Sequence, residues 1–201
     1  MDKKYLFKKY LDLDRWGSYW HQIAEILKCQ PHSVLEIGVG DKTIMTYLKT
    51  NYPDINYCSL DLDESLKPDI VGSVEQMPFT DEAFDLICAF EVLEHLPFDK
   101  FVDILKEMRR VSKNKVIISL PHWGRHFSLD FRLPFLKRLR WQCKISIFPI
   151  PHVIGEHFWE IGKADYPLKK IKEKIKEAGW ILERDFVAFE SPYHHFFILT
   201  K

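Results

Sequence analysis

The chain has 201 residues, 46% of them hydrophobic and 29% charged, which suits one ordinary globular domain with a real core. Basic and acidic side chains number 29 each, and this balance argues against a protein whose main task is to grip a nucleic-acid backbone. The four cysteines are scattered without a CxxC pair, and no apolar run approaches the ~20 residues of a membrane span. We therefore expect a single cytoplasmic domain over residues 1–201, without a disulfide framework or a metal site.

Helices and strands are predicted to alternate along most of the chain. Apolar residues recur at helical spacing over residues 16–27, and again over 44–48 and 98–111. Short apolar runs predict buried parallel strands at residues 33–37, 55–60, 69–71, 84–90 and 115–120. A last helix begins at Pro167 and ends at Gly179, and strands at 180–187 and 194–200 follow it. This rhythm predicts a doubly wound, Rossmann-like α/β sheet with right-handed crossovers.

Residues 122–165 break this rhythm and form an aromatic, proline-broken insertion between the fifth strand and the last helix. Within it, residues 131–141 (FRLPFLKRLRW) carry four basic residues and no acid, and their leucines fall on one side of a helix. Such a helix suits peripheral contact with a membrane or with an anionic or lipid-like substrate. Because surface helices are amphipathic by default, we favour a helical lid packed on its own domain.

A glycine turn follows the first strand and opens the next helix, which Asp41 is placed to cap. In open α/β sheets the ligand crevice lies at the carboxyl ends of strands, and Gly38 and Gly40 let backbone approach a ligand there. A dinucleotide fingerprint would end in a third glycine, where this chain has Thr43. The Glu36 carboxylate would repel a pyrophosphate but suits a cationic ligand, unless it only braces the loop.

An acidic residue also ends the second strand. Asp61 lies roughly twenty residues beyond the glycine turn, the spacing at which an acid can bind ribose hydroxyls. Asp63 is close enough to compete for this role, and an acid after a strand is also a common turn residue. Together with Glu36, Asp61 favours a positively charged nucleoside as the ligand of this crevice.

Four motifs occur in a fixed order: VLEIGVG at residues 34–40, LD at 60–61, MPF at 77–79 with FDLI at 84–87, and EVLEHL at 91–96. This ordered set resembles the type-11 family of class I S-adenosylmethionine-dependent methyltransferases, over about residues 33–121. The resemblance implies a seven-stranded sheet with an antiparallel last strand, and a cofactor lying across its first four strands. S-adenosylmethionine carries an ammonium and a sulfonium, which agrees with an acidic crevice.

The resemblance also implies roles for individual residues. It places Glu36, Gly38, Gly40, Phe90 and Glu91 at the methionine end of the cofactor. It places Asp61 at the ribose and Leu62 against the adenine. Many members have an acidic residue where this chain has Ser73, before Val74, so that the Ser73 hydroxyl would have to replace it as an acceptor for the adenine amino group.

Two histidines are candidates for a general base. His95 follows the fourth strand, and His157 lies in the insertion near Trp159 and Glu160. Either could remove a proton from an acceptor, because the histidine pKa lies near neutral pH, although His95 could equally serve only to bind a neighbouring loop. His194 and His195, in the last strand, should point to opposite faces of the sheet and therefore not share one site.

We therefore expect methyl transfer from S-adenosylmethionine to a small-molecule acceptor, with S-adenosylhomocysteine as the second product. Lipid-like and anionic molecules are the candidate acceptor classes. A cofactor-binding scaffold without activity is the alternative, and a nicotinamide oxidoreductase a weaker one. The insertion would select the acceptor and exclude water. The sequence identifies neither the acceptor nor the oligomeric state.

Overall fold

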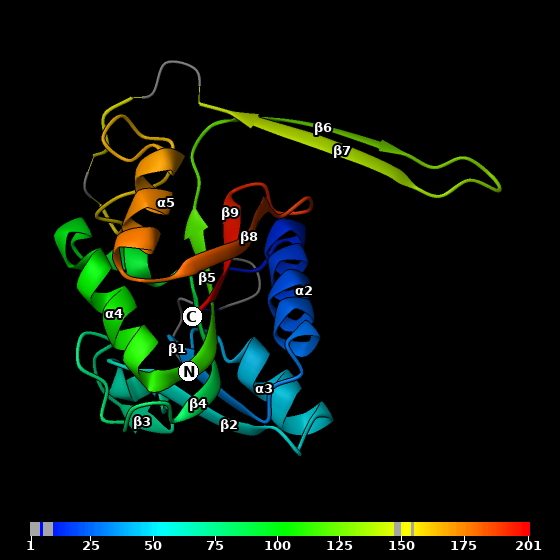
Figure 1. The fold of residues 1–201 in the computed structure, drawn as a ribbon. Coiled ribbons are helices and arrows are strands. Elements are labelled where there is room, and N and C mark those ends of the chain that lie inside the picture. The colour runs from blue at the N-terminus through cyan, green and yellow to red at the C-terminus, as the bar shows by residue number, and fades with distance from the viewer. Residues whose placement is uncertain (1–4, 6–9, 147–149, 154) are drawn as a thin grey trace.

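The structure is a computed structural model that describes residue 5 and residues 10–146, 150–153 and 155–201. Within these residues seven strands form one sheet, in the order β3-β2-β1-β4-β5-β9-β8 (Figure 1). From one edge to the other, these strands are β3 (Ile70–Val71), β2 (Asn56–Asp61), β1 (Ser33–Ile37), β4 (Phe84–Phe90), β5 (Ser112–Pro121), β9 (His194–Thr200) and β8 (Ile181–Val187).

Strand direction in the sheet confirms the expected topology. Strands β1 to β5 pair in parallel, whereas β9 is antiparallel to both of its neighbours, β5 and β8. A short loop is enough to join β8 to an antiparallel β9, whereas each parallel pair needs a longer crossover. The strand order reverses between β1 and β4, which is where such sheets form a ligand crevice.

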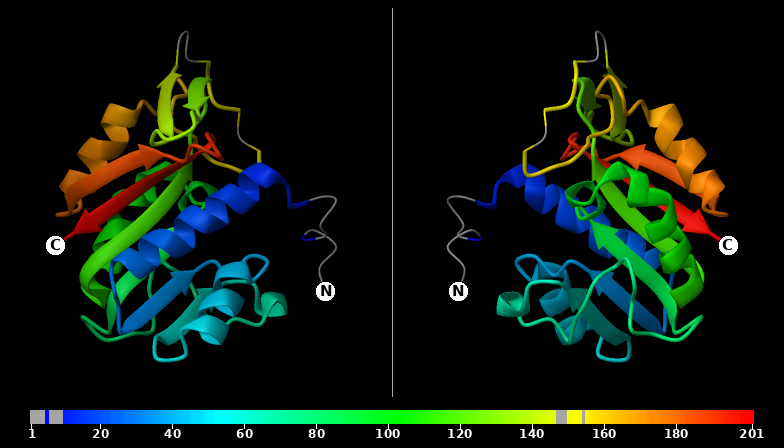
Figure 2. Two further views of the ribbon diagram at one scale, coloured as in Figure 1. Left: turned by 90° about the vertical axis from the view of Figure 1, so that its right-hand side faces the viewer. Right: turned by 90° about the vertical axis from the view of Figure 1, so that its left-hand side faces the viewer.

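Helices cover both faces of the sheet. Helices α2 (Leu13–Lys28) and α3 (Thr43–Asn51) lie on one face, and α4 (Phe101–Val111) and α5 (Leu168–Glu177) lie on the other (Figures 1 and 2). Short 3-10 helices occur at η2 (Glu64–Leu66), η3 (Leu93–His95) and η4 (Phe98–Lys100). In the described part of the chain, no helix has both the length and the apolar character to cross a bilayer.

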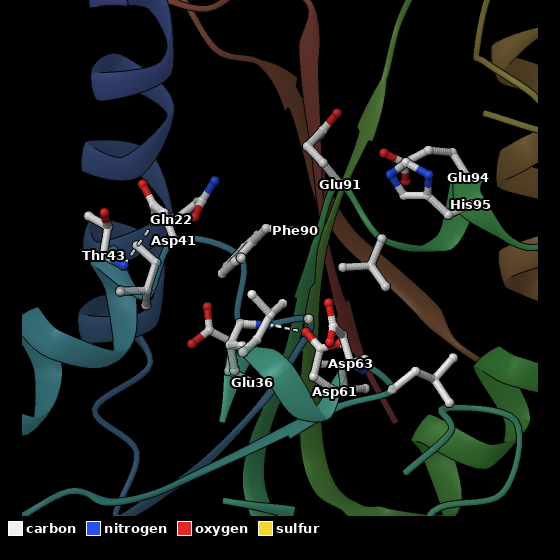
Figure 3. Close-up of a pocket in the computed structure, with 18 of the residues that line it drawn as sticks. Gln22, Glu36, Asp41, Thr43, Asp61, Asp63, Phe90, Glu91, Glu94 and His95 are labelled. Atoms are coloured by element: carbon white, nitrogen blue, oxygen red, sulfur yellow. Dashed lines mark hydrogen bonds between the residues drawn. The ribbon is translucent and has the colours of Figure 1, made fainter. Parts of the chain in front are cut away.

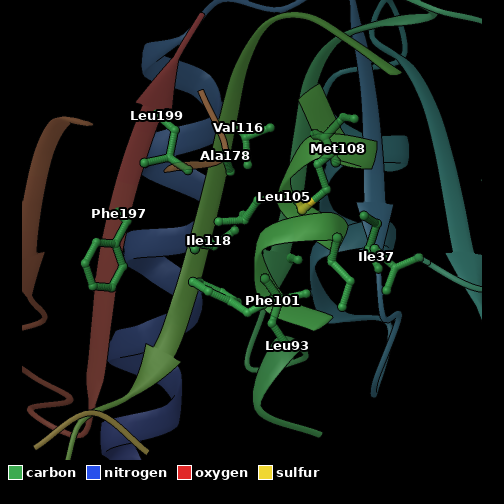
Figure 4. Packing of buried hydrophobic residues seen from close by; sticks show 14 of the residues in the cluster. Ile37, Leu93, Phe101, Leu105, Met108, Val116, Ile118, Ala178, Phe197 and Leu199 are labelled. Atoms are coloured by element: carbon green, nitrogen blue, oxygen red, sulfur yellow. The ribbon is translucent and has the colours of Figure 1, made fainter. Parts of the chain in front are cut away.

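Alternating strand residues supply two hydrophobic cores. In β4, Leu86 and Cys88 join the core beneath α2 and α3, whereas Ile87 and Ala89 join the core beneath α4 and α5. This is the two-residue period of a strand buried on both faces. Figure 4 shows the second core, where Leu105 and Phe101 of α4 pack against the sheet.

The insertion differs from its prediction. Residues 131–141 are not a helical lid; they form the end of an antiparallel hairpin made by β6 (Arg125–Phe131) and β7 (Leu139–Ile145). Pro134 has no N–H for a helix, and apolar residues at every second position from Phe127 onward favour strands. The hairpin projects from the body of the molecule rather than lying on it (Figure 1).

Two details near the N-terminus also differ. Trp16 and Trp20 of α2 are 47% and 64% exposed, although both belong to the apolar pattern that predicted the helix. At α3 the capping residue is Lys42 rather than Asp41, but an Asp41 carboxylate oxygen does accept the N–H of Thr43 at 3.0 Å. The expected polar cap is therefore present one residue earlier than the helix boundary.

Candidate functional site

A pocket of about 470 Å³ opens at the carboxyl ends of β1, β2 and β4 (Figure 3). At one end Figure 3 shows Glu36, Asp61 and Asp63, and at the other Glu91, Glu94 and His95. The first group follows β1 and β2, and the second follows β4. Since parallel strands end at one edge of the sheet, segments far apart in the sequence meet here.

Glu36 is the most buried acid at the first end. Glu36 is the penultimate residue of β1, directly before Ile37 and the glycine turn, and it is only 4% exposed. Burial, followed by the negative charges of Asp41 and Asp61, raises the pKa of Glu36 well above its usual range. One of its carboxylate oxygens is buried without a hydrogen-bond partner. A buried acceptor of this kind is unusual in a native fold and suits a cationic donor.

The glycine turn brings backbone close to this carboxylate. Gly38 has φ of 79°, and a Cβ on it would lie 2.4 Å from Cγ2 of Val92. Gly40 also has positive φ, at 47°. Both the conformation and the close approach therefore require glycine at residue 38, whereas at Gly40 only the conformation favours glycine.

Asp61 ties the end of β2 to this turn. One carboxylate oxygen accepts the N–H of Val39 at 2.9 Å, and the other accepts the N–H of Asp63 at 2.9 Å. The side chain of Asp63 instead accepts the N–H of Ser65, at the start of η2. Asp61 is thus held rigidly at the pocket, and each of its oxygens keeps lone-pair capacity for a further donor.

The remaining residues expected at the cofactor divide into two groups. Leu62, Val74 and Phe90 line the pocket. Ser73 does not; its hydroxyl accepts the N–H of Glu75 at 3.1 Å in a local turn. The Ser73 hydroxyl therefore bonds the neighbouring backbone, as serine side chains commonly do in turns.

Glu91 begins the second end of the pocket. Its backbone has φ of 54°, and one carboxylate oxygen accepts the Ser119 hydroxyl at 2.7 Å. Burial raises the pKa of Glu91 to about 8. A non-glycine residue at positive φ costs free energy, and such residues cluster at functional sites.

Glu94 and His95 follow on η3. Glu94 is 0% exposed, and burial raises its pKa well above the usual range, with the charge of Glu91 adding to the effect. Neither of its carboxylate oxygens has a hydrogen-bond partner. Nδ1 of His95 donates to the backbone carbonyl of Glu156, 2.8 Å away in the insertion.

The insertion also brings His157 to this end of the pocket. The N–H of Phe158 donates to the carbonyl of Glu94 at 2.8 Å, and the fully buried Trp159 donates to the carbonyl of Leu96 at 3.0 Å. These contacts place the His157 ring 4.9 Å from the His95 ring. Both candidate bases therefore line one pocket.

The two histidines of β9 do point to opposite faces, as expected. His194 lines the pocket, with Nε2 3.7 Å from a carboxylate oxygen of Glu91. His195 instead bonds Asp185 of β8 at 2.9 Å and His122 at 2.8 Å. The His195 ring therefore belongs to a structural network away from the pocket.

Sequence reasoning missed the aromatic wall of the pocket. Tyr10, Arg15 and Tyr19 reach it from the region of α2, and Tyr193 reaches it from the loop before β9. Tyr19 donates to Asp41 at 2.8 Å, and Tyr193 donates to Glu160 at 2.9 Å. Tyr19 belongs to the apolar pattern that predicted α2, but that pattern does not mark it as a pocket residue. Tyr10 and Tyr193 lie outside any periodic pattern.

Residues 35–120 match a family model described as a methyltransferase domain. This match confirms, for that part of the chain, the class I type-11 methyltransferase family inferred from the motifs. No protein of curated function shows significant sequence similarity to the chain.

Solved structures share the fold over nearly the whole length. An S-adenosylmethionine-dependent methyltransferase from Clostridium acetobutylicum has a TM-score of 0.62 at 10% identity, over 98% of this chain and 95% of its own. Magnesium protoporphyrin IX methyltransferase from Synechocystis, with bound S-adenosylhomocysteine, has a TM-score of 0.62 at 10% identity. This match covers 100% of the present chain and 90% of that enzyme. A 1,6-didemethyltoxoflavin-N1-methyltransferase from Burkholderia thailandensis has a TM-score of 0.55 at 13% identity, and the match covers 94% of the present chain and 81% of that enzyme. At these identities the likeness establishes the Rossmann-like fold.

Proposed function

We propose that this protein transfers a methyl group from S-adenosylmethionine to a small-molecule acceptor. The observation that carries the proposal is Glu36, a buried carboxylate with one unpartnered oxygen beside the glycine turn. An ammonium group would supply the missing donor, whereas a pyrophosphate would meet repulsion from Glu36 and Asp61. The match of residues 35–120 to a methyltransferase domain supports the same ligand.

The residues of the pocket fit this cofactor along its length. Glu36, Gly38 and Gly40 would hold the amino-acid end, with Phe90 and Glu91 beside it. Asp61 would accept from the ribose hydroxyls, and Leu62 and Val74 would contact the adenine. Ser73 has no place in this arrangement, because its side chain is not in the pocket lining.

The bound cofactor supplies a methyl group that its sulfonium already activates. The chain itself has to align the acceptor with that group, and alignment of this kind contributes roughly 7–11 kcal/mol in favourable systems. His95 lies at the end of the pocket away from Glu36, where an acceptor would lie (Figure 3). The His157 ring lines the same pocket, 4.9 Å from the His95 ring. Either would hold the acceptor's proton where that acceptor is protonated at neutral pH.

Calorimetry distinguishes this function from its two alternatives. S-adenosylhomocysteine should bind the purified protein and raise its melting temperature, and NADH should do neither. Binding of NADH alone would replace the proposal with an oxidoreductase. Binding of S-adenosylhomocysteine without methyl transfer to any member of an acceptor library would favour the non-catalytic scaffold.

The hairpin bears on the class of acceptor. Because residues alternate, one face of β6 and β7 carries only large apolar side chains near its end, which are 45–72% exposed: Phe127, Leu129, Phe131, Leu139 and Trp141. The opposite face contacts the body, where Gln142 donates to the carbonyl of Val187 and Arg140 pairs with Glu190. The apolar face is therefore directed away from the body.

We propose that this apolar face docks on an anionic lipid surface. The strip continues at the tip into Phe135, and the tip also carries Arg132 and Lys137. The sequence has no acid between Asp130 and Glu156, and Asp130 is already paired with Arg138. Apolar side chains flanked by cations match the boundary of an anionic bilayer, and such docking favours a lipid-like acceptor. The protein would then act at the cytoplasmic face of a membrane.

Vesicle sedimentation tests this docking. The protein should pellet with vesicles of phosphatidylcholine and phosphatidylserine mixed at about 7:3, which present an anionic surface. It should pellet less with vesicles of phosphatidylcholine alone. Phe135→Ser combined with Trp141→Ser should abolish pelleting, whereas Trp20→Ser, at another exposed tryptophan, should not. A wild type that stays in the supernatant, or one that dimerises through the hairpin instead, would refute the proposal.

A further inference from the structure

Three side chains at the second end of the pocket have the chemistry of metal ligands. They are Glu94 and His95 on η3 and His157 in the insertion, and one ligand atom from each lies within 4.8 Å of the others. All three line the pocket. The residues come from segments about sixty positions apart, so the spacing of the sequence gave no indication of this group.

Glu94 is the strongest indication that a cation belongs here. The residue is 0% exposed, and both carboxylate oxygens lack a hydrogen-bond partner, although the group lines the pocket. A buried, unpaired carboxylate is costly, and in native proteins it is normally paired or coordinates a metal. A divalent ion between Glu94 and the histidines would provide the missing partner.

Hydrogen bonds orient both histidine rings for such a role. Nδ1 of His95 donates to the Glu156 carbonyl at 2.8 Å, and Nδ1 of His157 donates to the Glu160 carboxylate at 3.1 Å. Since Nδ1 carries the hydrogen in each ring, Nε2 carries the lone pair. Metal-ligating histidines use this arrangement, in which a carbonyl or carboxylate holds the far side of the ring.

We propose that Glu94, His95 and His157 bind one divalent transition-metal ion. Two imidazole nitrogens and one carboxylate suit Zn²⁺, Co²⁺ or Mn²⁺ better than Ca²⁺ or Mg²⁺, which prefer oxygen ligands. With the ion bound, His95 and His157 serve as its ligands and no longer accept a proton from the acceptor. Three protein ligands leave a coordination position open towards the pocket. If the proposed methyl transfer is correct, this position would bind and orient an oxygen of the acceptor, so this second part rests on the proposed function.

Titration of the protein with Co²⁺, after treatment with a chelator, tests the site directly. One equivalent should bind and give the visible absorption of a low-coordinate ion, and azide should change that spectrum if one position is open. Calorimetry with Zn²⁺ should give the same stoichiometry. Failure of the wild type to bind one equivalent of either ion would refute the site.

Variants identify the ligands and separate them from the fold. Glu94→Gln and His157→Gln should each weaken Co²⁺ binding more than ~100-fold, and Glu160→Gln should weaken it about 10- to 100-fold through the His157 ring. His32→Gln, at an exposed histidine that does not line the pocket, should leave Co²⁺ binding unchanged. Equal losses in His32→Gln and His157→Gln would show unspecific binding and overturn the proposal.

The two proposals fail in different ways. The variants should keep the stabilisation by S-adenosylhomocysteine, which reports an intact fold and an intact Glu36 end. Metal binding without any methyl transfer would leave the metal site standing and remove the proposed function. Cofactor binding and methyl transfer without stoichiometric metal would leave the proposed function standing and remove the metal site.

Discussion

The sheet domain (residues 10–121 and 166–201) and the insertion at residues 122–165 use apolar side chains in opposite ways. In the former, Leu105 and Ile87 are 0% exposed and pack between the sheet and α4. In the latter, Leu136 and Trp141 are 66% and 53% exposed on the hairpin. The difference indicates that the sheet domain carries the stability of the fold and that the hairpin presents its apolar surface to something else.

The insertion is not uniform, however. Its segment after residue 155 is anchored through Trp159, which is fully buried, and supplies His157 to the pocket. The two parts of the insertion therefore have different tasks. One part completes the pocket, and the other part extends away from it (Figure 1).

Truncating one leucine in each region tests this contrast most strongly. Leu105→Ala should lower the free energy of unfolding by about 2–5 kcal/mol, because it leaves a cavity in the core. Leu136→Ala should change the free energy of unfolding by less than ~0.5 kcal/mol, because this exposed side chain has few buried contacts that truncation could remove. Urea denaturation measures both. A comparable loss in the two variants would mean that the hairpin packs on the body in solution.

Glycine substitutions sharpen the contrast at the level of the backbone. Gly38→Ala should lower the free energy of unfolding by about 2–4 kcal/mol, since its Cβ meets Val92 and φ is 79°. Gly155→Ala in the insertion is the control, because a Cβ there has no neighbour within 4 Å. Thermal and urea unfolding give both values. A Gly38→Ala variant whose free energy of unfolding equals that of the wild type would contradict the turn geometry.

The acidic end of the pocket should be required for the cofactor. Glu36→Gln should weaken S-adenosylhomocysteine binding by about 10- to 100-fold, equivalent to losing a ~1.5–3 kcal/mol hydrogen bond to a charged group. Glu173→Gln on α5, away from the pocket, should leave affinity unchanged. Calorimetry on both proteins is the measurement, and equal affinities would remove Glu36 from the site.

The buried histidine at the pocket predicts a smaller, pH-dependent effect. Burial lowers the pKa of His194 to about 3. The unfolded chain, with a pKa near 6.5, binds the proton that the folded state excludes, so stability is lost as pH falls below ~6.5. Between pH 7 and 5 this should cost about 1–2 kcal/mol, and His194→Gln should show a correspondingly flatter profile. Parallel profiles for the two proteins would refute the assignment.

Local patterns determined most of the sheet domain. The apolar runs at residues 33–37 and 84–90 coincide with β1 and β4, because a strand buried on both faces must be apolar throughout. The glycine turn and Asp61 were placed at one crevice for a similar reason, since consecutive strands of this topology end at the same edge. The pattern gave the wrong structure where a helical and a strand period overlapped, at residues 131–141.

The sequence by itself determined the α/β class, the topology and the first, acidic end of the pocket, because these depend on periodicity and on residues that directly follow strands. Only the tertiary structure decided that the insertion forms a projecting hairpin and that Glu94, His95 and His157 converge. That convergence depends on long-range contacts such as Trp159 with the Leu96 carbonyl. Contacts between segments about sixty residues apart leave no local pattern, so no reading of neighbouring residues could reveal them.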